Sequence, residues 1–199
     1  MAGIQGKNFW TDLALEPKRK FKFYVDLAPL SPTSDTSTSL DYWLVKSITK
    51  PSFTVGAPPH QILNHTFYYP GKVEWNSVEA VFVDPGGPYD TSNSLLNKLR
   101  EGGYKYPDES QTHMLTKRAL SNDLKIYQFI QHASNNQLDG EAEQQLLEKW
   151  TLKNAWIQDI KFGDLAYDAE EMVDVSVTFR YDWAEIQAYP QNVELAVNI

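Results

Sequence analysis

The sequence predicts a mainly β protein: an antiparallel sandwich or barrel of two packed sheets, with one flanking α-helix and long loops. Three observations support this class. The stretch 172–183 alternates apolar and polar residues with a period of two, as a half-buried strand does. Other short apolar stretches recur along the chain with turn residues between them. Helical patterns that would connect parallel strands are scarce, which favours antiparallel pairing.

Composition limits the possible classes further. A chain of 199 residues with 42% hydrophobic content is large enough to fill the core of one domain over 1–199. The absence of cysteine excludes disulfides and thiolate chemistry. The net charge is -8, and residues 121–199 hold 14 acidic but only 5 basic side chains, which argues against a groove that binds nucleic acid. We expect neither a transmembrane helix nor a signal peptide, because long apolar runs are missing.

The first part of the chain alternates between strands and loops. Residues 1–19 are interpreted as a polar N-terminal arm, and a first strand is predicted over 20–27. Residues 28–40 are rich in Pro, Ser and Thr, which predicts a loop insertion. Further strands are predicted over 42–48 and 60–69, with prolines at or near their ends.

The middle of the chain predicts a fourth strand and the one clear helix. The strand covers 73–83, where the apolar phase changes midway, so that either a bulge lies near Asn76-Ser77 or the second half is buried on both faces. The helix has a leucine stripe, a start among residues 90–92 that can cap it, and a stop at Gly102-Gly103. The stripe consists of Leu95, Leu96 and Leu99.

The remaining elements are less regular. Residues 104–145 are interpreted as a second loop insertion, although 124–129 has the composition of a strand or a helix end. Residues 139–149 have helical composition, and 151–162 is predicted to be a strand. Residues 187–199 are expected to form an extended C-terminal tail.

The polar face of the 172–183 strand is the candidate functional surface. It combines charged side chains with hydroxyls and contains no catalytic constellation. The candidate residues are Asp174, Ser176, Thr178, Arg180 and Asp182.

Residue patterns that carry chemistry are weak elsewhere. His60 and His65 are five apart, so on one strand they would face opposite sides, and no histidine pair has metal-ligand spacing. The carboxylates of 164–174 lack the spacing of a calcium loop and are interpreted as a solvated turn. A carbohydrate-binding or hydrolysing sandwich that uses these carboxylates and the tryptophans is the alternative from another class. We predict no enzyme activity, no cofactor and no metal site.

Three segments together resemble a known family. Residues 45–53 are a strand that ends in a proline-bearing bend. Residues 69–84 contain a Pro-Gly-Lys turn, a tryptophan, an apolar strand and a closing aspartate, and the leucine-rich helix follows. Residues 150–183 run from a tryptophan-rich strand to the alternating strand. In this order, over about residues 20–186, they resemble the tail tube proteins of contractile-tailed (T4-like) bacteriophages.

The resemblance implies a single tail-tube domain that forms hexameric rings, which stack into a hollow tube inside the contractile sheath. DNA would pass through without specific binding, and an acidic lining would repel its phosphates. The polar faces of the strands around 73–83 and 172–183 would line this channel, although the late strand could equally face the sheath. The candidate channel-facing residues are Asp174, Ser176, Thr178, Arg180 and Asp182. The implied partners are further copies, the sheath protein, the baseplate or tube initiator, the tail terminator and a tape measure protein in the lumen. The implied location is the phage tail of the virion, after assembly in the host cytoplasm. A same-fold initiator, baseplate or terminator protein, or the inner tube of a contractile injection system, is the close alternative.

Overall fold

The computed structural model describes most of the predicted strands. The described residues are 18–30, 40–87, 90–108, 116–129, 146–168 and 170–189. Most of the predicted N-terminal arm and C-terminal tail, and parts of both predicted loop insertions, therefore lie outside the described residues.

The chain divides into two compact units. The larger unit comprises residues 25–125 and 151–185, and the smaller unit comprises residues 1–24, 126–150 and 186–199. The larger unit contains the surfaces discussed below.

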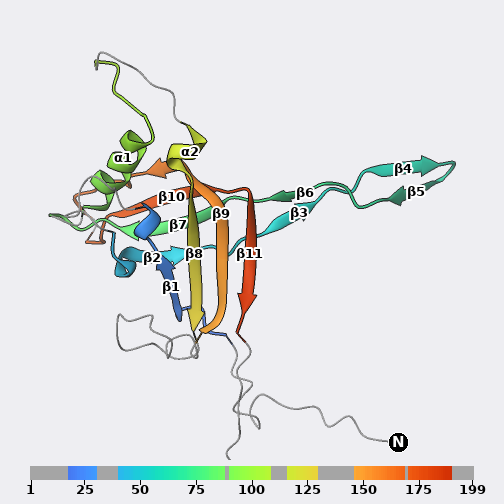
Figure 1. Cartoon of the computed structure of the whole chain (residues 1–199), viewed down its shortest axis with the longest axis horizontal. Coiled ribbons are helices and arrows are strands. Elements are labelled where there is room, and N and C mark those ends of the chain that lie inside the picture. The colour runs from blue at the N-terminus through green and yellow to red at the C-terminus, as the bar shows by residue number, and fades with distance from the viewer. Residues whose placement is uncertain are drawn as a thin grey trace, which may run out of the picture. The chain divides into compact units, whose positions relative to one another are not determined.

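Strands dominate the described residues, and α1 (Thr91–Glu101) is the main helix (Figure 1). One hydrogen-bonded path runs in the order β1-β8-β9-β10-β7-β2, and β11 pairs with β9. The pairings of β10 with β7, of β10 with β9 and of β2 with β7 are antiparallel. The predicted mainly β class with antiparallel sheets and one helix is therefore confirmed. The strands of this path are β1 (Phe23–Asp26), β2 (Val45–Ile48), β7 (Val78–Val83), β8 (Asn122–Phe129), β9 (Leu146–Lys161), β10 (Asp174–Arg180) and β11 (Trp183–Ala188).

The centre of the larger unit is the antiparallel pair β7 and β10. Val177 lies opposite Ala80 and Val175 lies opposite Phe82. These side chains are buried, as is Phe179, which is 0% exposed. The predicted period-two alternation of the late strand is thus confirmed for 174–180, and its dry face is core.

The helix α1 is held in place by carboxylates at its first turn. Asp90 caps it and accepts a hydrogen bond from the backbone N–H of Asn93 at 2.8 Å. Asp84, which closes β7, accepts from the backbone N–H of Thr91 at 3.0 Å. Leu95 is fully buried, so the predicted helix and its capping start are confirmed.

Several predicted elements differ from the structure. Residues 146–149 belong to β9 and are not helical, because burial there alternates with the strand period at Leu146 and Glu148. Residues 42–44 form a 3-10 turn ahead of β2. The range 104–145 is not one loop, since it contains α2 (Lys117–Leu120) and β8. The late strand ends at Arg180, and β11 starts at Trp183 and continues to 188.

A two-stranded ribbon, the long hairpin (residues 51–77), interrupts the path between β2 and β7 (Figure 1). Its base pairs β3 (Phe53–Val55) with β6 (Val73–Trp75), and its tip pairs β4 (Pro59–Ile62) with β5 (His65–Tyr68). The prediction of one strand over 60–69 is therefore wrong. The tip turns at Leu63-Asn64, and Leu63 has a φ of 53°. A two-residue hairpin turn favours positive φ, but Leu-Asn lacks the glycine that normally signals such a turn.

The predicted strand 73–83 is divided at Asn76-Ser77, where the apolar phase changes. The part before this break belongs to the long hairpin, and the part after it belongs to the central sheet. The alternative of a second half buried on both faces is wrong, because Glu79 is exposed while its neighbours Val78 and Ala80 are buried.

No helix of the described ranges is long and apolar enough to cross a bilayer.

Candidate assembly surfaces

Two surfaces of the larger unit are candidates for function: the polar sheet face, centred on β10, and the tip of the long hairpin. The residues of the polar sheet face follow from the pairing of β10 with its two neighbours, β7 and β9. Ser176 lies between Val81 of β7 and Lys161 of β9, and Thr178 lies between Glu79 and Asp159. Since partners in register share a face, these side chains surround the hydroxyls of β10 on the side away from the core.

The charges on the polar sheet face balance. Its acidic side chains are Glu79, Asp159 and Asp174, and its basic side chains are Lys46, Lys161 and Arg180. The acidic excess of the second half of the sequence is therefore not on this face. The expectation of an acidic lining does not apply to it, because basic residues come from β2 and β9, which pattern reading of β10 alone does not include.

Asp174 takes part in an ion pair across the sheet. Its Oδ2 accepts from Lys46 Nζ at 2.5 Å. This hydrogen bond, with the attraction between the two charges, raises the pKa of Lys46. The other oxygen, Oδ1, is buried and has no hydrogen-bond partner within the described ranges. Asp174 therefore holds β2 to β10 across β7, which is a structural task.

Asp182 does not join the other four candidates. It lies past the end of β10, where its carboxylate accepts from Lys117 Nζ at 2.5 Å and from Asn154 Nδ2 at 2.8 Å. The hydrogen bond from Lys117 lowers the pKa of Asp182, and that from Asn154 adds to the effect. Its backbone N–H donates to the carbonyl of Lys153 at 3.0 Å.

Asn154 is the centre of this second cluster. It has a φ of 54° within β9, a left-handed conformation that asparagine tolerates better than most residues. Its backbone N–H donates to Asp123 at 3.3 Å, and Asp123 also pairs with Lys153 at 2.7 Å. The hydrogen bond from Lys153 lowers the pKa of Asp123. Sequence reasoning missed this cluster, because its members are far apart in sequence and no local motif marks them.

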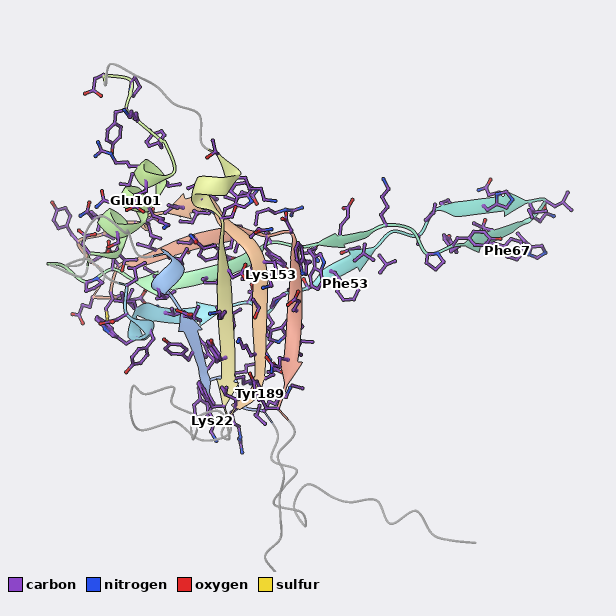
Figure 2. The ribbon with its side chains drawn as sticks, viewed as in Figure 1. Lys22, Phe53, Phe67, Glu101, Lys153 and Tyr189 are labelled. Atoms are coloured by element: carbon purple, nitrogen blue, oxygen red, sulfur yellow. The ribbon has the colours of Figure 1, made fainter. Side chains whose placement is uncertain are left out.

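Aromatic side chains join the base of the long hairpin to the sheet. The rings of Phe53 and Trp75 lie edge to face at 5.3 Å, and Trp75 lies 6.0 Å from Tyr181 (Phe53 is labelled in Figure 2). Burial raises the pKa of Tyr181. Asn76 donates from its side chain to Ser52 Oγ at 3.1 Å, which closes the base.

The long hairpin has a joint at Gly56 and Gly71. Gly56 donates to the carbonyl of Lys72 at 2.9 Å, and Gly71 donates to the carbonyl of Gly56 at 2.6 Å. Two residues of the returning strand thus oppose one residue of the outgoing strand, which is a β-bulge. A Cβ on Gly71 would lie 2.9 Å from the Gly56 oxygen and 3.0 Å from Pro58 Cδ, so only glycine fits.

The bulge sets which side chains meet at the tip. Phe53 lies opposite Trp75 in the base, whereas His60 lies opposite Phe67 in the tip, one residue out of the first register. Ile62 and His65 form the next pair along the same face. The apolar tip face therefore consists of His60, Ile62, His65 and Phe67. The expectation that the two histidines face opposite sides is wrong, because the chain reverses between them.

The tip is exposed although it is apolar. Ile62 is 51% exposed, Phe67 is 49% exposed and the turn residue Leu63 is 96% exposed; Figure 2 shows Phe67 on the projecting ribbon. Residues 51–71 contain no Asp, Glu, Lys or Arg. Such a stretch is the signal that pattern reading overlooked: an exposed, uncharged ribbon normally marks a contact with another protein.

Within the described part of the chain, no group of three or more metal-ligating side chains is placed to hold a metal ion.

Comparison with solved structures identifies the fold of this chain. No protein-family model matches the chain, and no curated protein matches it in sequence. Among solved structures, a chain of the anti-feeding prophage tube-terminating cap is similar, with a TM-score of 0.60 at 13% identity over 95% of this chain and 100% of that one. A chain of the sheath–tube complex of the extracellular contractile injection system PVC has a TM-score of 0.54 at 14% identity. The match covers 89% of this chain and 96% of that one. The anti-feeding prophage baseplate also contains a similar chain, with a TM-score of 0.56 at 12% identity. The match covers 87% of this chain and 97% of that one.

These likenesses establish that the chain has a tail-tube-like fold. They do not favour a T4-like phage over other contractile particles, because these three structures come from the anti-feeding prophage and from an extracellular contractile injection system.

Proposed function

We propose that this protein is a structural subunit of the inner tube of a contractile tail or contractile injection system. Copies associate into rings, and the rings stack into a hollow tube through which DNA or another cargo passes. The fold supports this proposal, because the similar chains belong to multi-subunit tube, cap and baseplate assemblies. A sheath and a baseplate are the expected outer partners.

The observation that carries the proposal is the long hairpin. A lone protein gains nothing from an uncharged ribbon that leaves Ile62, Leu63 and Phe67 in water. The ribbon also has open strand edges, which in a free monomer promote uncontrolled association. Burial of these side chains against a second copy removes both problems, and its contribution grows with the apolar area covered.

We propose that the polar sheet face borders the channel. The predicted residues Asp174, Ser176, Thr178 and Arg180 all lie on β10, and their neighbours balance the charge. A face of hydroxyls and matched charges favours passage of cargo over capture, because no basic patch is available to hold phosphate. Asp182 is not included in this lining, since it lies past the end of β10.

A second candidate is a tube cap or terminator of the same fold. The likeness to the tube-terminating cap, which extends over 95% of this chain, favours it. A cap and a tube subunit differ in growth: a cap forms one ring that does not extend, whereas tube subunits add ring upon ring.

Electron microscopy of the purified full-length chain, at increasing concentration, tests the proposal. Stacked rings that lengthen with concentration are expected for a tube subunit, and single rings for a cap. Monomers at all concentrations would overturn both, and affinity of such monomers for glycans would support the carbohydrate-binding alternative.

Thiol labelling tests the channel face separately. The chain has no cysteine, so Ser176→Cys provides a unique label. In assembled tubes we expect a bulky thiol reagent to react much more slowly with this position than in free subunits. Equal rates in the two states would contradict the channel assignment. Gly86→Cys, at an exposed position where a Cβ meets nothing within 4 Å, is the control for access to the particle.

A further inference from the structure

The tip of the long hairpin contains two histidines that lie on one face, each opposite an apolar residue. His60 lies opposite Phe67, and His65 lies opposite Ile62, so that the imidazoles occupy diagonal positions on one face. The ring of His60 also contacts the ring of Tyr69, at 6.4 Å between centroids. Both imidazoles are therefore part of the same apolar face that the proposed contact covers.

The two histidines lie in a stretch, residues 51–71, that contains no Asp, Glu, Lys or Arg. The tip sheet contains only β4 and β5, and the ionisable side chains beside the histidines are the phenols of Tyr68 and Tyr69. The nearest Asp, Glu, Lys or Arg residues along the chain are Lys50 and Glu74, below and in the base, and Lys72, at the joint. Histidine is the side-chain type that can respond to protons between about pH 5 and 8.

We propose that His60 and His65 make the docking of the long hairpin onto a second copy sensitive to protons, so that mild acid releases the contact. The inference rests on the proposed function, because it requires that the tip is covered in the assembly.

The physical reason is desolvation. A protonated imidazole enters an apolar contact only at a cost, and two protonated imidazoles on one face also repel each other. The docked state therefore holds fewer protons than the free tip, and acid shifts the equilibrium to the free subunit by linkage. For a group that titrates near pH 6.5 and must dock neutral, lowering the pH from about 7.5 to about 5.5 weakens the association about tenfold.

The ion pairs of Asp123 and Asp182 are expected to stay intact in this pH range. The pKa values of Asp123 and Asp182 lie below the ordinary value of 3.8, so their ion pairs persist down to pH values far below those at which histidine titrates.

The test is sedimentation velocity of the full-length chain at about pH 7.5 and about pH 5.5, at constant ionic strength and with EDTA to remove bridging metal ions. The concentration for half assembly is expected to rise about tenfold for each histidine involved, so up to about a hundredfold. His60→Gln/His65→Gln, which is neutral at both pH values, should remove the dependence. His113→Gln/His132→Gln changes the other two histidines of the chain and should keep it.

The outcomes are distinct. An assembly that responds to neither pH nor the His60→Gln/His65→Gln change would overturn the histidine inference and leave the proposed function standing. A pH dependence that persists in His60→Gln/His65→Gln would also overturn the inference. If the wild-type chain stays monomeric at both pH values, the proposed function fails and the inference fails with it. Far-UV circular dichroism at both pH values confirms that the subunit remains folded.

Discussion

The central sheet and the long hairpin follow the same period-two rule with opposite results. In β7 and β10 the apolar side chains of the core face, such as Phe82 and Phe179, are at most 1% exposed. In the tip, Ile62 and Phe67 alternate equally regularly and remain about half exposed. Alternation thus predicts that a strand has an apolar face, but the partner that covers this face can be the same chain or another molecule.

The two regions also use charge differently. The polar side of the sheet is tied by ion pairs, such as Lys46–Asp174, and the end of β10 is tied through Asp182 to Lys117 and Asn154. Residues 51–71 contain no Asp, Glu, Lys or Arg. We therefore expect changes in the sheet to alter folding stability, and changes in the tip to alter assembly while stability stays the same.

The largest effect is expected in the core. Phe179→Ala removes a fully buried ring, and we expect it to lower the free energy of unfolding by about 3–5 kcal/mol. Denaturant unfolding of the monomer measures this. Phe67→Ala in the tip is the matched change and should alter stability by about 0.5 kcal/mol or less. Similar losses in both variants would contradict the distinction between the two regions.

A smaller effect is expected at Asn154. Asn154→Val places a β-branched residue at a φ of 54° and removes the hydrogen bond to Asp182, so a loss of about 1–3 kcal/mol is expected. Asn154→Gly keeps the backbone conformation and should lose less. Thermal unfolding of the two variants checks the order. Equal losses would mean that the backbone conformation contributes little.

The ion pair of Asp182 gives a pH-dependent effect. Because the folded state lowers the pKa of this carboxyl, its contribution is present above about pH 4 and is lost as the pH falls through the folded value. Asp182→Asn should therefore be less stable than wild type at pH 7, by about 1 kcal/mol or less, and equal to it near about pH 2. Urea unfolding across pH measures the difference, and a pH-independent gap would contradict the electrostatic explanation.

The smallest effect on stability is expected at the joint of the hairpin. Gly71→Ala brings a methyl group within 2.9 Å of the Gly56 oxygen, which should disturb the bulge and impair assembly. The melting temperature of the monomer should stay within about 1 °C of wild type, because the joint lies outside the core. Gly86→Ala, where a Cβ meets nothing within 4 Å, is the control and should assemble normally.

The sequence correctly predicted the elements that are determined by local residue patterns. The alternation in 174–180, the capped helix at Asp90 and the phase change at Asn76-Ser77 are all encoded within a few residues, and the structure contains all of them. The resemblance to tail tube proteins led to the right fold. A T4-like phage and hexameric rings stay predictions.

The features that the sequence did not predict depend on contacts between distant residues or on an unusual turn. The tip turn at Leu63-Asn64 has no glycine, so one strand was expected in place of a hairpin. The charge balance of the polar sheet face comes from Lys46 and Lys161 on other strands, which reading β10 alone does not include. The cluster at Asn154 joins residues from separate elements and has no signature in any single segment.

The most direct test of the account compares two neighbouring residues of the tip. Phe67 lies on the apolar tip face with His60, whereas Tyr68 lies on the opposite face with Pro59 and is more exposed, at 69%. Sedimentation velocity of Phe67→Ser and Tyr68→Ser, at one concentration where the wild type assembles, separates the two faces. We predict monomers for Phe67→Ser and wild-type assemblies for Tyr68→Ser. Normal assembly of Phe67→Ser would contradict the claim that this face of the long hairpin joins copies of the protein.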